Sequence, residues 1–301
     1  MSDSSPIVEK IDPSLAAELR RPLPTYRAFF NSGMTAIALI LTALAILPLG
    51  SILLEILLRG WQNLNWDVFT NLPAPAGVTD VPNGFGNAIL GTLMMVGIAS
   101  AIAIPVGVLT GIFLSEFGRN TAIGSSIRFI ITILTGIPSI IAGVFAYGVL
   151  ILNKVTQFSA VAGGFALAVI MLPIVALTTE EALKLIPNHQ RLGSAALGAN
   201  RLQTTFRIVV ASAIPAITTG VLLAVARAAG ETAPLLFTAL FSISWPDGLF
   251  NPTPALSVLI YNYANSPDIG QNQMAWTAAL VLVGLVLCIS IISRMATRRR
   301  Q

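Results

Sequence analysis

The sequence predicts an all-α polytopic membrane protein with six transmembrane helices. Three observations support this fold class. Hydrophobic residues make up 55% of the 301 positions and charged residues only 10%, a composition typical of chains that are dissolved in lipid. The hydrophobic residues form runs that are long enough to cross a hydrocarbon core of about 30 Å. When these runs are counted as spans, the Lys and Arg residues fall mostly on one side of the membrane.

Six apolar runs set the expected domain limits. Residues 1–33 form a polar tail, residues 34–293 form the transmembrane domain, and residues 294–301 form a basic C-terminus. The tail lacks a short apolar core with a small-residue cleavage site, so it is expected to be retained rather than removed as a secretory signal. Within the domain, the runs cover roughly residues 34–58, 87–114, 129–151, 160–178, 207–228 with an extension past Pro234, and 275–293.

The basic residues predict the orientation of these spans. With the N-terminus in the cytoplasm, 14 of the 17 Lys and Arg residues lie on the cytoplasmic side, Arg59 and Lys154 lie outside, and Arg227 lies within a span. Basic residues beside a span favour the cytoplasmic side during insertion. We therefore expect both termini in the cytoplasm. The same distribution accounts for the net charge of +4 without a nucleic-acid-binding surface.

The small numbers of histidine and cysteine residues exclude several classes of functional site. His189 is the only histidine and Cys288 is the only cysteine, which excludes a multi-histidine metal site and an intrachain disulfide. No G-x-x-x-x-G-K-[ST] phosphate loop occurs in the sequence. We therefore expect no metal, no cofactor and no ATP hydrolysis in this chain alone. A membrane enzyme that uses Glu180, Glu181 and His189 is a weaker alternative, because helix capping and charge compensation account for these residues.

Glycine and proline residues predict where the spans pack and bend. Gly107 and Gly111 have the G-x-x-x-G spacing that lets two helices approach closely, and packing within the chain is a more frequent reason for it than dimerisation. Proline removes a backbone donor, so Pro138 is expected to bend the third span and Pro173 to interrupt the fourth.

The longest internal loop joins the fourth and fifth spans, over about residues 179–206. A threonine followed by glutamates in TTEEALKLI predicts a helix start, and Pro187 is expected to end that helix. A second short helix is expected from about Arg191 to Asn200. Two short helices would present a compact cytoplasmic knob to a soluble partner.

An arginine and a glutamate lie four residues apart in the fifth span, within ARAAGETAPLL. An arginine at mid-membrane costs about 2.5–3.5 kcal/mol on insertion scales, so Arg227 is expected to face protein or water. Glu231 is close enough on a helix to pair with it. The pair is either a structural lock or the empty state of a pathway where Arg227 meets an anion and Thr232 adds a polar contact. Gly230 and Pro234 are expected to form a hinge, with a kink for packing alone as the other interpretation.

Several motifs resemble a known family. The loop sequence LGSAALGANRLQTTFRIVVA resembles the EAA loop of ABC importer permeases, with Gly198 and Ile208 on the glycine and isoleucine of that pattern. Four positions depart from the family, where the glutamate, the two alanines and the proline are replaced by Leu192, Gly193, Ser194 and Ala211. GFGNAILGTL, GIPSIIAG, TTEEALKLIP and above all ARAAGETAPLLFTAL resemble the PstA-type permease subunits of phosphate-specific ABC importers.

The resemblance implies a type I ABC importer permease (MetI-like) fold and ATP-driven import of inorganic phosphate across a bacterial cytoplasmic (inner) membrane. It implies a complex with a PstC-like permease, two PstB-like ATPase subunits that bind ATP and Mg²⁺, and a periplasmic PstS-like phosphate-binding protein. The loop would dock into the ATPase through Ala195, Ala196, Leu197, Gly198, Ala199 and Asn200.

Two alternatives remain open at this point. One is a permease for another oxyanion, sulfate or molybdate, because an arginine alone does not choose among such anions. The other is a self-sufficient secondary anion carrier. Such carriers often show inverted repeats, and the sequence shows no convincing internal repeat.

Overall fold

The computed structural model describes residues 25–78 and 81–298. Most of the predicted polar tail and the last three residues of the basic C-terminus therefore lie outside the described residues. The described residues contain only helical elements, turns and loops, without a strand. By its internal contacts the chain divides after Glu55 into two compact units.

The described part of the first unit is helix α2, which runs from Thr25 to Gly60 and ends just inside the second unit. It starts earlier than the predicted apolar run. This helix is long and apolar enough to cross a membrane, and none of the residues in its most apolar stretch is buried within the chain. At its end, the Arg59 guanidinium lies over the Trp276 ring, 5.2 Å from the centroid.

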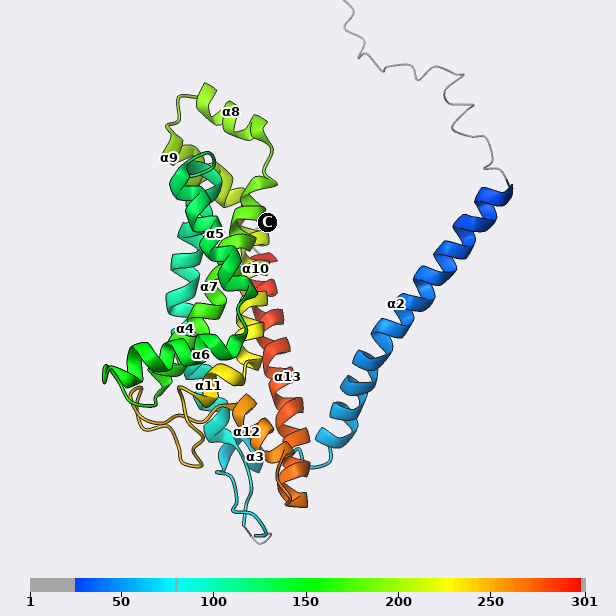
Figure 1. Ribbon diagram of the computed structural model, residues 1–301, viewed down its shortest axis with the longest axis vertical. Helices are drawn as coiled ribbons and strands as arrows, with labels where there is room; N and C mark the ends of the chain where they lie inside the picture. The colour runs from blue at the N-terminus through cyan, green and yellow to red at the C-terminus, as the bar shows by residue number, and fades with distance from the viewer. Residues whose placement is uncertain (1–24, 79–80, 299–301) are drawn as a thin grey trace, which may run out of the picture. The chain divides into compact units, whose positions relative to one another are not determined.

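The second unit is built from eleven further α-helices and three π-helical segments among the described residues (Figure 1). The helices are α3 (Asp67–Thr70), α4 (Gly86–Ile112), α5 (Ala122–Gly136), α6 (Ser139–Ala146), α7 (Ala160–Lys184), α8 (Asn188–Ala196), α9 (Arg201–Gln203), α10 (Ala211–Gly230), α11 (Ala233–Leu236), α12 (Leu256–Ala264) and α13 (Ile269–Arg298). The π-helical segments are Phe113–Phe117, Tyr147–Leu152 and Thr204–Val210.

The number of spans depends on one sharply bent segment. Five helical segments are individually long and apolar enough to cross a membrane. The segments Ala122–Gly136 and Ser139–Leu152 pass the same criterion together, but they meet at an angle of 106°. The all-α fold class is confirmed, and the described spans number six when this bent pair is counted as one.

Proline chemistry explains the bend. Ile137 has an extended backbone, with φ −75° and ψ 131°, which is the conformation that a following proline favours. Pro138 then precedes the first residue of α6, where its missing N–H costs nothing. The predicted bend at Pro138 is confirmed, although it is a right-angled break rather than a kink, and α6 lies across the direction of α5 in Figure 1.

Helix α7 forms the centre of the second unit, and 61% of its most apolar stretch is buried. Glycines bring its neighbours close. A Cβ on Gly107 would lie 2.8 Å from the Val175 side chain, and a Cβ on Gly111 would lie 2.7 Å from the Ala176 carbonyl oxygen. The G-x-x-x-G spacing therefore serves packing of α4 on α7 within the chain, as expected.

Two sequence expectations about α7 are wrong. Pro173 does not interrupt the helix, which continues from Ala160 to Lys184. Since Pro173 is buried against neighbouring helices, tertiary packing offsets the single hydrogen bond that it removes. The threonines and glutamates of TTEEALKLI also do not start a separate helix. Thr179 and Glu180 are buried within α7, so they belong to the packed helix rather than to a solvated loop.

Candidate functional site

The fifth span is broken at the glutamate of ARAAGETAPLL. Helix α10 ends at Gly230, and Glu231 is extended, with φ −71° and ψ 130°. Thr232 precedes the one-turn helix α11, in which Pro234 is the second residue. A proline fits there because the first turn of a helix leaves its N–H groups without helical partners. The structure therefore has an interruption at the position where the sequence predicts a hinge.

The predicted ion pair is present, and it is a weak contact. Arg227 lies in the last turn of α10, and its Nε is 3.4 Å from Oε1 of Glu231. The Arg227 side chain is 58% exposed and that of Glu231 is 15% exposed. A cation in the last turn also complements the negative end of the helix dipole. Because only one edge of the guanidinium faces Glu231, its other N–H groups are free to meet another ligand.

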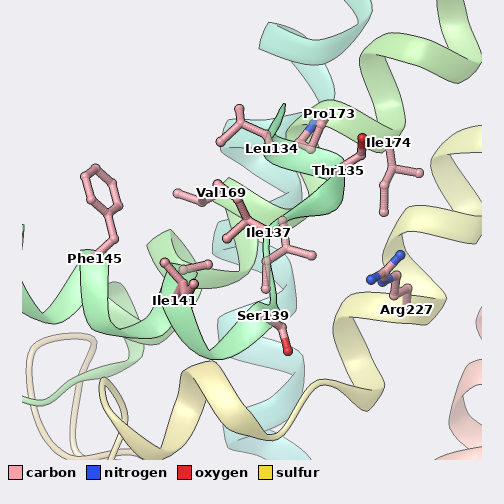
Figure 2. A pocket seen from close by; sticks show the side chains of 12 residues that line it. Leu134, Thr135, Ile137, Ser139, Ile141, Phe145, Val169, Pro173, Ile174 and Arg227 are labelled. Atoms are coloured by element: carbon pink, nitrogen blue, oxygen red, sulfur yellow. The ribbon is translucent and has the colours of Figure 1, made fainter. Parts of the chain in front are cut away.

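Arg227 lies on the wall of a cavity of about 200 Å³. The cavity is formed by the end of α5, the start of α6, the middle of α7 and the last turns of α10 (Figure 2). Its other lining residues are mostly apolar, with Thr135 and Ser139 as the polar exceptions. In Figure 2 the Arg227 side chain extends from α10 toward the segment that carries Ile137 and Ser139. Arg227 therefore borders a largely apolar cavity, while more than half of its side chain is exposed within the chain alone.

Two residues that the sequence did not single out hold the break in place. The Ser257 hydroxyl on α12 donates to the Glu231 carbonyl oxygen at 2.8 Å. A Cβ on Gly143 would lie 2.5 Å from the Pro234 Cα, so α6 and α11 touch through their backbones at this point. Gly143 is the last residue of the quoted GIPSIIAG motif, but no local pattern in the sequence indicates this contact. Nothing near Ser257 in the sequence indicates its contact with a residue 26 positions away.

The other predicted set of site residues forms the turn between α8 and α9. Ala195 and Ala196 end α8, and Leu197, which follows, is 91% exposed. Gly198 has φ +81°, a left-handed conformation that favours glycine and ends a helix. The helix expected to reach Asn200 therefore stops earlier. Asn200 instead caps α9, where it forms a capping box with Gln203.

These two sets lie apart within the second unit. In Figure 1 the α8–α9 turn lies at the top end of the second unit, and α11 lies in its lower half, between α6 and α12. Leu197, Gly198 and Ala199 line a surface hollow with Arg207 and Ile208, whereas Arg227 lines the cavity at the bend between α5 and α6. Any functional link between the two sets must therefore pass through the helices.

A network of ion pairs around the buried Glu180 and the nearby Glu116 was missed by sequence reasoning. Glu180 is 2% exposed and accepts from Arg128 Nε at 2.8 Å and from Lys184 Nζ at 2.7 Å. Glu116 accepts from Arg191 through both oxygens, at 2.7 and 3.2 Å. The partners in two of these pairs are 52 and 75 positions apart, so no local spacing indicates them. Glu180 is held by two cations within the packed helix, which favours a structural role over the weaker enzyme hypothesis.

Comparisons with known proteins identify related chains. The family described as "Binding-protein-dependent transport system inner membrane component" matches residues 103–301. The phosphate transport system permease protein PstA of Haemophilus influenzae is 40% identical over 273 residues, covering 90% of this chain and 94% of that protein. The probable phosphate transport system permease protein PstA of Methanocaldococcus jannaschii is 39% identical over 260 residues, covering 86% of this chain and 90% of that one.

A solved structure supports the fold. A chain of a bacterial ABC transporter involved in the import of the acidic polysaccharide alginate matches with a TM-score of 0.60 at 15% identity. The match covers 91% of this chain and 96% of that chain. At this level of identity the likeness concerns the arrangement of helices alone.

Proposed function

The chain belongs to the PstA family of phosphate transport system permeases, and we propose that it forms one half of an ATP-driven pathway that imports inorganic phosphate. The observation that carries this proposal is the position of Arg227, on a cavity wall at a helix break and only weakly held by Glu231. The membrane in question is a bacterial cytoplasmic membrane, with both termini in the cytoplasm. This orientation rests on the distribution of basic residues along the sequence.

The chemistry of the cavity suits a phosphate ion. A guanidinium is always charged and presents a planar fork of donors that matches two oxygens of a phosphate. Apolar walls such as Ile137 and Ile174 reduce the screening of that attraction by water. Ser139 begins α6 and lines the same cavity, and the start of a helix favours negative charge.

Glu231 pairs with Arg227 when the pathway holds no phosphate. In the absence of phosphate, its carboxylate neutralises Arg227 at 3.4 Å. An arriving phosphate competes for the same guanidinium, and Glu231 then accepts a hydrogen bond from a protonated phosphate oxygen. Thr232 and the backbone groups at the break supply further polar contacts, and Gly230 and Pro234 act as the hinge that lets the break move.

The pathway needs partners that complete it and drive it. A PstC-like permease would supply the second half, and a PstS-like binding protein would deliver phosphate from the periplasm. Two PstB-like ATPases would bind ATP and Mg²⁺ and receive the α8–α9 turn, whose exposed Leu197 offers an apolar contact. Ala195, Ala196, Gly198, Ala199 and Asn200 shape that turn. No cofactor is assigned to this chain.

Transport by the reconstituted complex tests the proposal. Proteoliposomes that contain all four kinds of subunit would be assayed for uptake of labelled phosphate and for ATPase activity. We expect Arg227→Ala to lower uptake by about tenfold or more, because hydrogen bonds to charged groups contribute about 1.5–3 kcal/mol. Arg227→Lys should recover only part of this loss, since an ammonium lacks the planar fork, and Glu231→Gln should also lower uptake.

A matched control separates the cavity from general effects of charge. Lys154 is an exposed cation in the turn after the Tyr147–Leu152 segment and does not line the cavity. Lys154→Gln should transport phosphate at the wild-type rate. Unchanged uptake in all three cavity variants would remove Arg227 and Glu231 from the pathway. Competition with excess sulfate or molybdate in the same assay would show whether the complex carries another oxyanion instead.

A further inference from the structure

Arg191 fastens α8 to the end of α4. Its guanidinium donates to both carboxylate oxygens of Glu116, in the π-helical segment Phe113–Phe117 that follows α4. It also donates to the carbonyl oxygens of Ile186 and Leu183 at 2.6 and 3.1 Å, at the end of α7. A two-pronged contact of this kind fixes orientation as well as distance.

Arg201, which follows the α8–α9 turn, contacts the same Phe113–Phe117 segment. Arg201 at the start of α9 donates to the Glu116 carbonyl oxygen. Its guanidinium also lies over the Phe117 ring, 4.8 Å from the centroid. Arg191 before the α8–α9 turn and Arg201 after it therefore both bind Glu116, and Arg201 also contacts Phe117. A displacement of the turn therefore acts on the Phe113–Phe117 segment.

Arg128 connects this segment to two further helices. It lies on α5 and donates to the Leu114 carbonyl oxygen at 2.7 Å, inside the same segment. Its Nε donates to Glu180 on α7 at 2.8 Å, and its Nη1 donates to the Arg119 carbonyl oxygen at 3.4 Å. One side chain thus joins the segment beneath the turn to both α5 and α7.

Helix α5 reaches from this joint to the cavity. It is a single helix from Ala122 to Gly136, and Leu134 and Thr135 near its end line the cavity with Arg227. Arg128 and Thr135 are about 10 Å apart along the helix, at a rise of about 1.5 Å per residue. A shift at Arg128 therefore moves the cavity wall as part of one rigid element.

We propose that Arg128 is a positioning residue that transmits displacement of the α8–α9 turn to the cavity wall, through Glu116 and the Phe113–Phe117 segment. The inference rests on the proposed function, because it assigns the turn to the ATPase and the cavity to phosphate. Arg128 touches neither ligand. Its role is to couple ATP hydrolysis to the transport of phosphate.

The charges around Glu180 make this inference testable without loss of the fold. Lys184 also binds Glu180, at 2.7 Å from one turn along α7. If Arg128 is replaced by glutamine, Glu180 keeps a cationic partner, so no buried carboxylate is left unpaired. The complementary variant, Lys184→Gln, removes a cation from the same carboxylate but leaves the contacts of Arg128 intact.

The measurement is the number of ATP molecules hydrolysed per phosphate imported by the complete complex in proteoliposomes. We expect Arg128→Gln to raise this ratio by about fivefold or more, the lower end of typical coupling between sites. Lys184→Gln should leave it near the wild-type value, and Arg128→Lys should restore part of the coupling. Glu116→Gln should raise the ratio as well. Because Arg128 and Glu116 lie in one chain of contacts, the double variant should be no worse than the worse single variant.

The outcomes separate this inference from the proposed function. A wild-type ratio in both Arg128→Gln and Glu116→Gln would overturn the inference, while loss of uptake in Arg227→Ala would leave the proposed function standing. An equal rise in Lys184→Gln would also overturn it, because the effect would then follow the charge around Glu180 rather than the joint. A wild-type complex that imports no phosphate would overturn both.

Discussion

Two ion-paired regions of this molecule use the same residue types in opposite ways. At the break in the fifth span, Arg227 and Glu231 meet in a single contact at 3.4 Å, and more than half of the arginine side chain is exposed. Near the α8 end, Glu180 is almost completely buried and accepts from two cations at 2.7 and 2.8 Å. An exposed pair contributes little to stability, whereas removal of one partner from a buried pair is costly.

The difference shows how burial decides what an ion pair can do. At the break the arginine side chain is 58% exposed and its contact is a single one at 3.4 Å, so the pair can separate when another anion competes for the arginine. The charges around Glu180 cannot separate without leaving a carboxylate in a low-dielectric interior. The first arrangement suits a site that changes partners, and the second suits a joint that must hold its geometry.

The largest effect on stability is expected at the buried carboxylate. Loss of one partner from a fully buried pair costs about 3–5 kcal/mol, and because Arg128 and Lys184 are partly exposed we expect about 2 kcal/mol for Glu180→Ala. This corresponds to a fall of about 4 °C or more in the apparent melting temperature of the purified chain. Glu181→Ala is the control, since that neighbouring glutamate is exposed. Equal melting temperatures for the two variants would contradict the buried network.

An effect of similar size is expected where α6 touches α11. In Gly143→Ala the new methyl group meets the Pro234 backbone at 2.5 Å, which forces the two helices apart at a cost of about 1–3 kcal/mol. Gly136→Ala places a methyl group where nothing lies within 4 Å, so it should be neutral or slightly stabilising. Thermal melting would compare the two. A Gly143→Ala protein as stable as Gly136→Ala would mean that the break is not held by this contact.

The α8–α9 turn should respond to backbone strain. Gly198→Ala puts a side chain at φ +81°, which costs about 1 kcal/mol. Gly193→Ala, within α8 and with open space around it, should be neutral or stabilising. The strained variant should also co-purify with less of the ATPase subunit. Equal melting and equal ATPase yield for the two variants would show that the turn does not need this conformation.

The smallest effect on stability is expected at the break itself. Glu231→Gln removes an ion pair whose arginine is exposed. Such pairs contribute about 0.2–1 kcal/mol to the free energy of unfolding, so the melting temperature should change by about 2 °C at most. Uptake of phosphate should nevertheless fall in this variant. A loss of stability as large as that of Glu180→Ala would sharply contradict the contrast between the two regions.

The sequence predicted the fold better than the contacts within it. Run length located the spans, and the spacing of Gly107 and Gly111 predicted close packing of helices, because both signals are local. The break before Pro234 and the bend at Pro138 followed from the missing proline N–H. Pro173 behaved differently because packing around α7 outweighed the same local rule.

The missed contacts share a physical cause. Ser257, Gly143, Arg128 and Arg191 act on residues far away in the sequence, so their roles depend on how the helices pack. The helix-start pattern of TTEEALKLI places Glu180 at the beginning of the loop over residues 179–206, because a local pattern does not show the partners that let a charged residue be buried. Its two cationic partners, on α5 and α7, make that burial stable.

The single cysteine offers a practical route to watch the chain move. Cys288 lies on α13, and its side chain is exposed. A thiol-reactive spin label or fluorophore would therefore attach to this chain at one defined point, with no native thiol to replace. A second cysteine at the exposed Leu197 position would complete a pair of probes, and the distance between them would follow the α8–α9 turn through a cycle of ATP binding and hydrolysis.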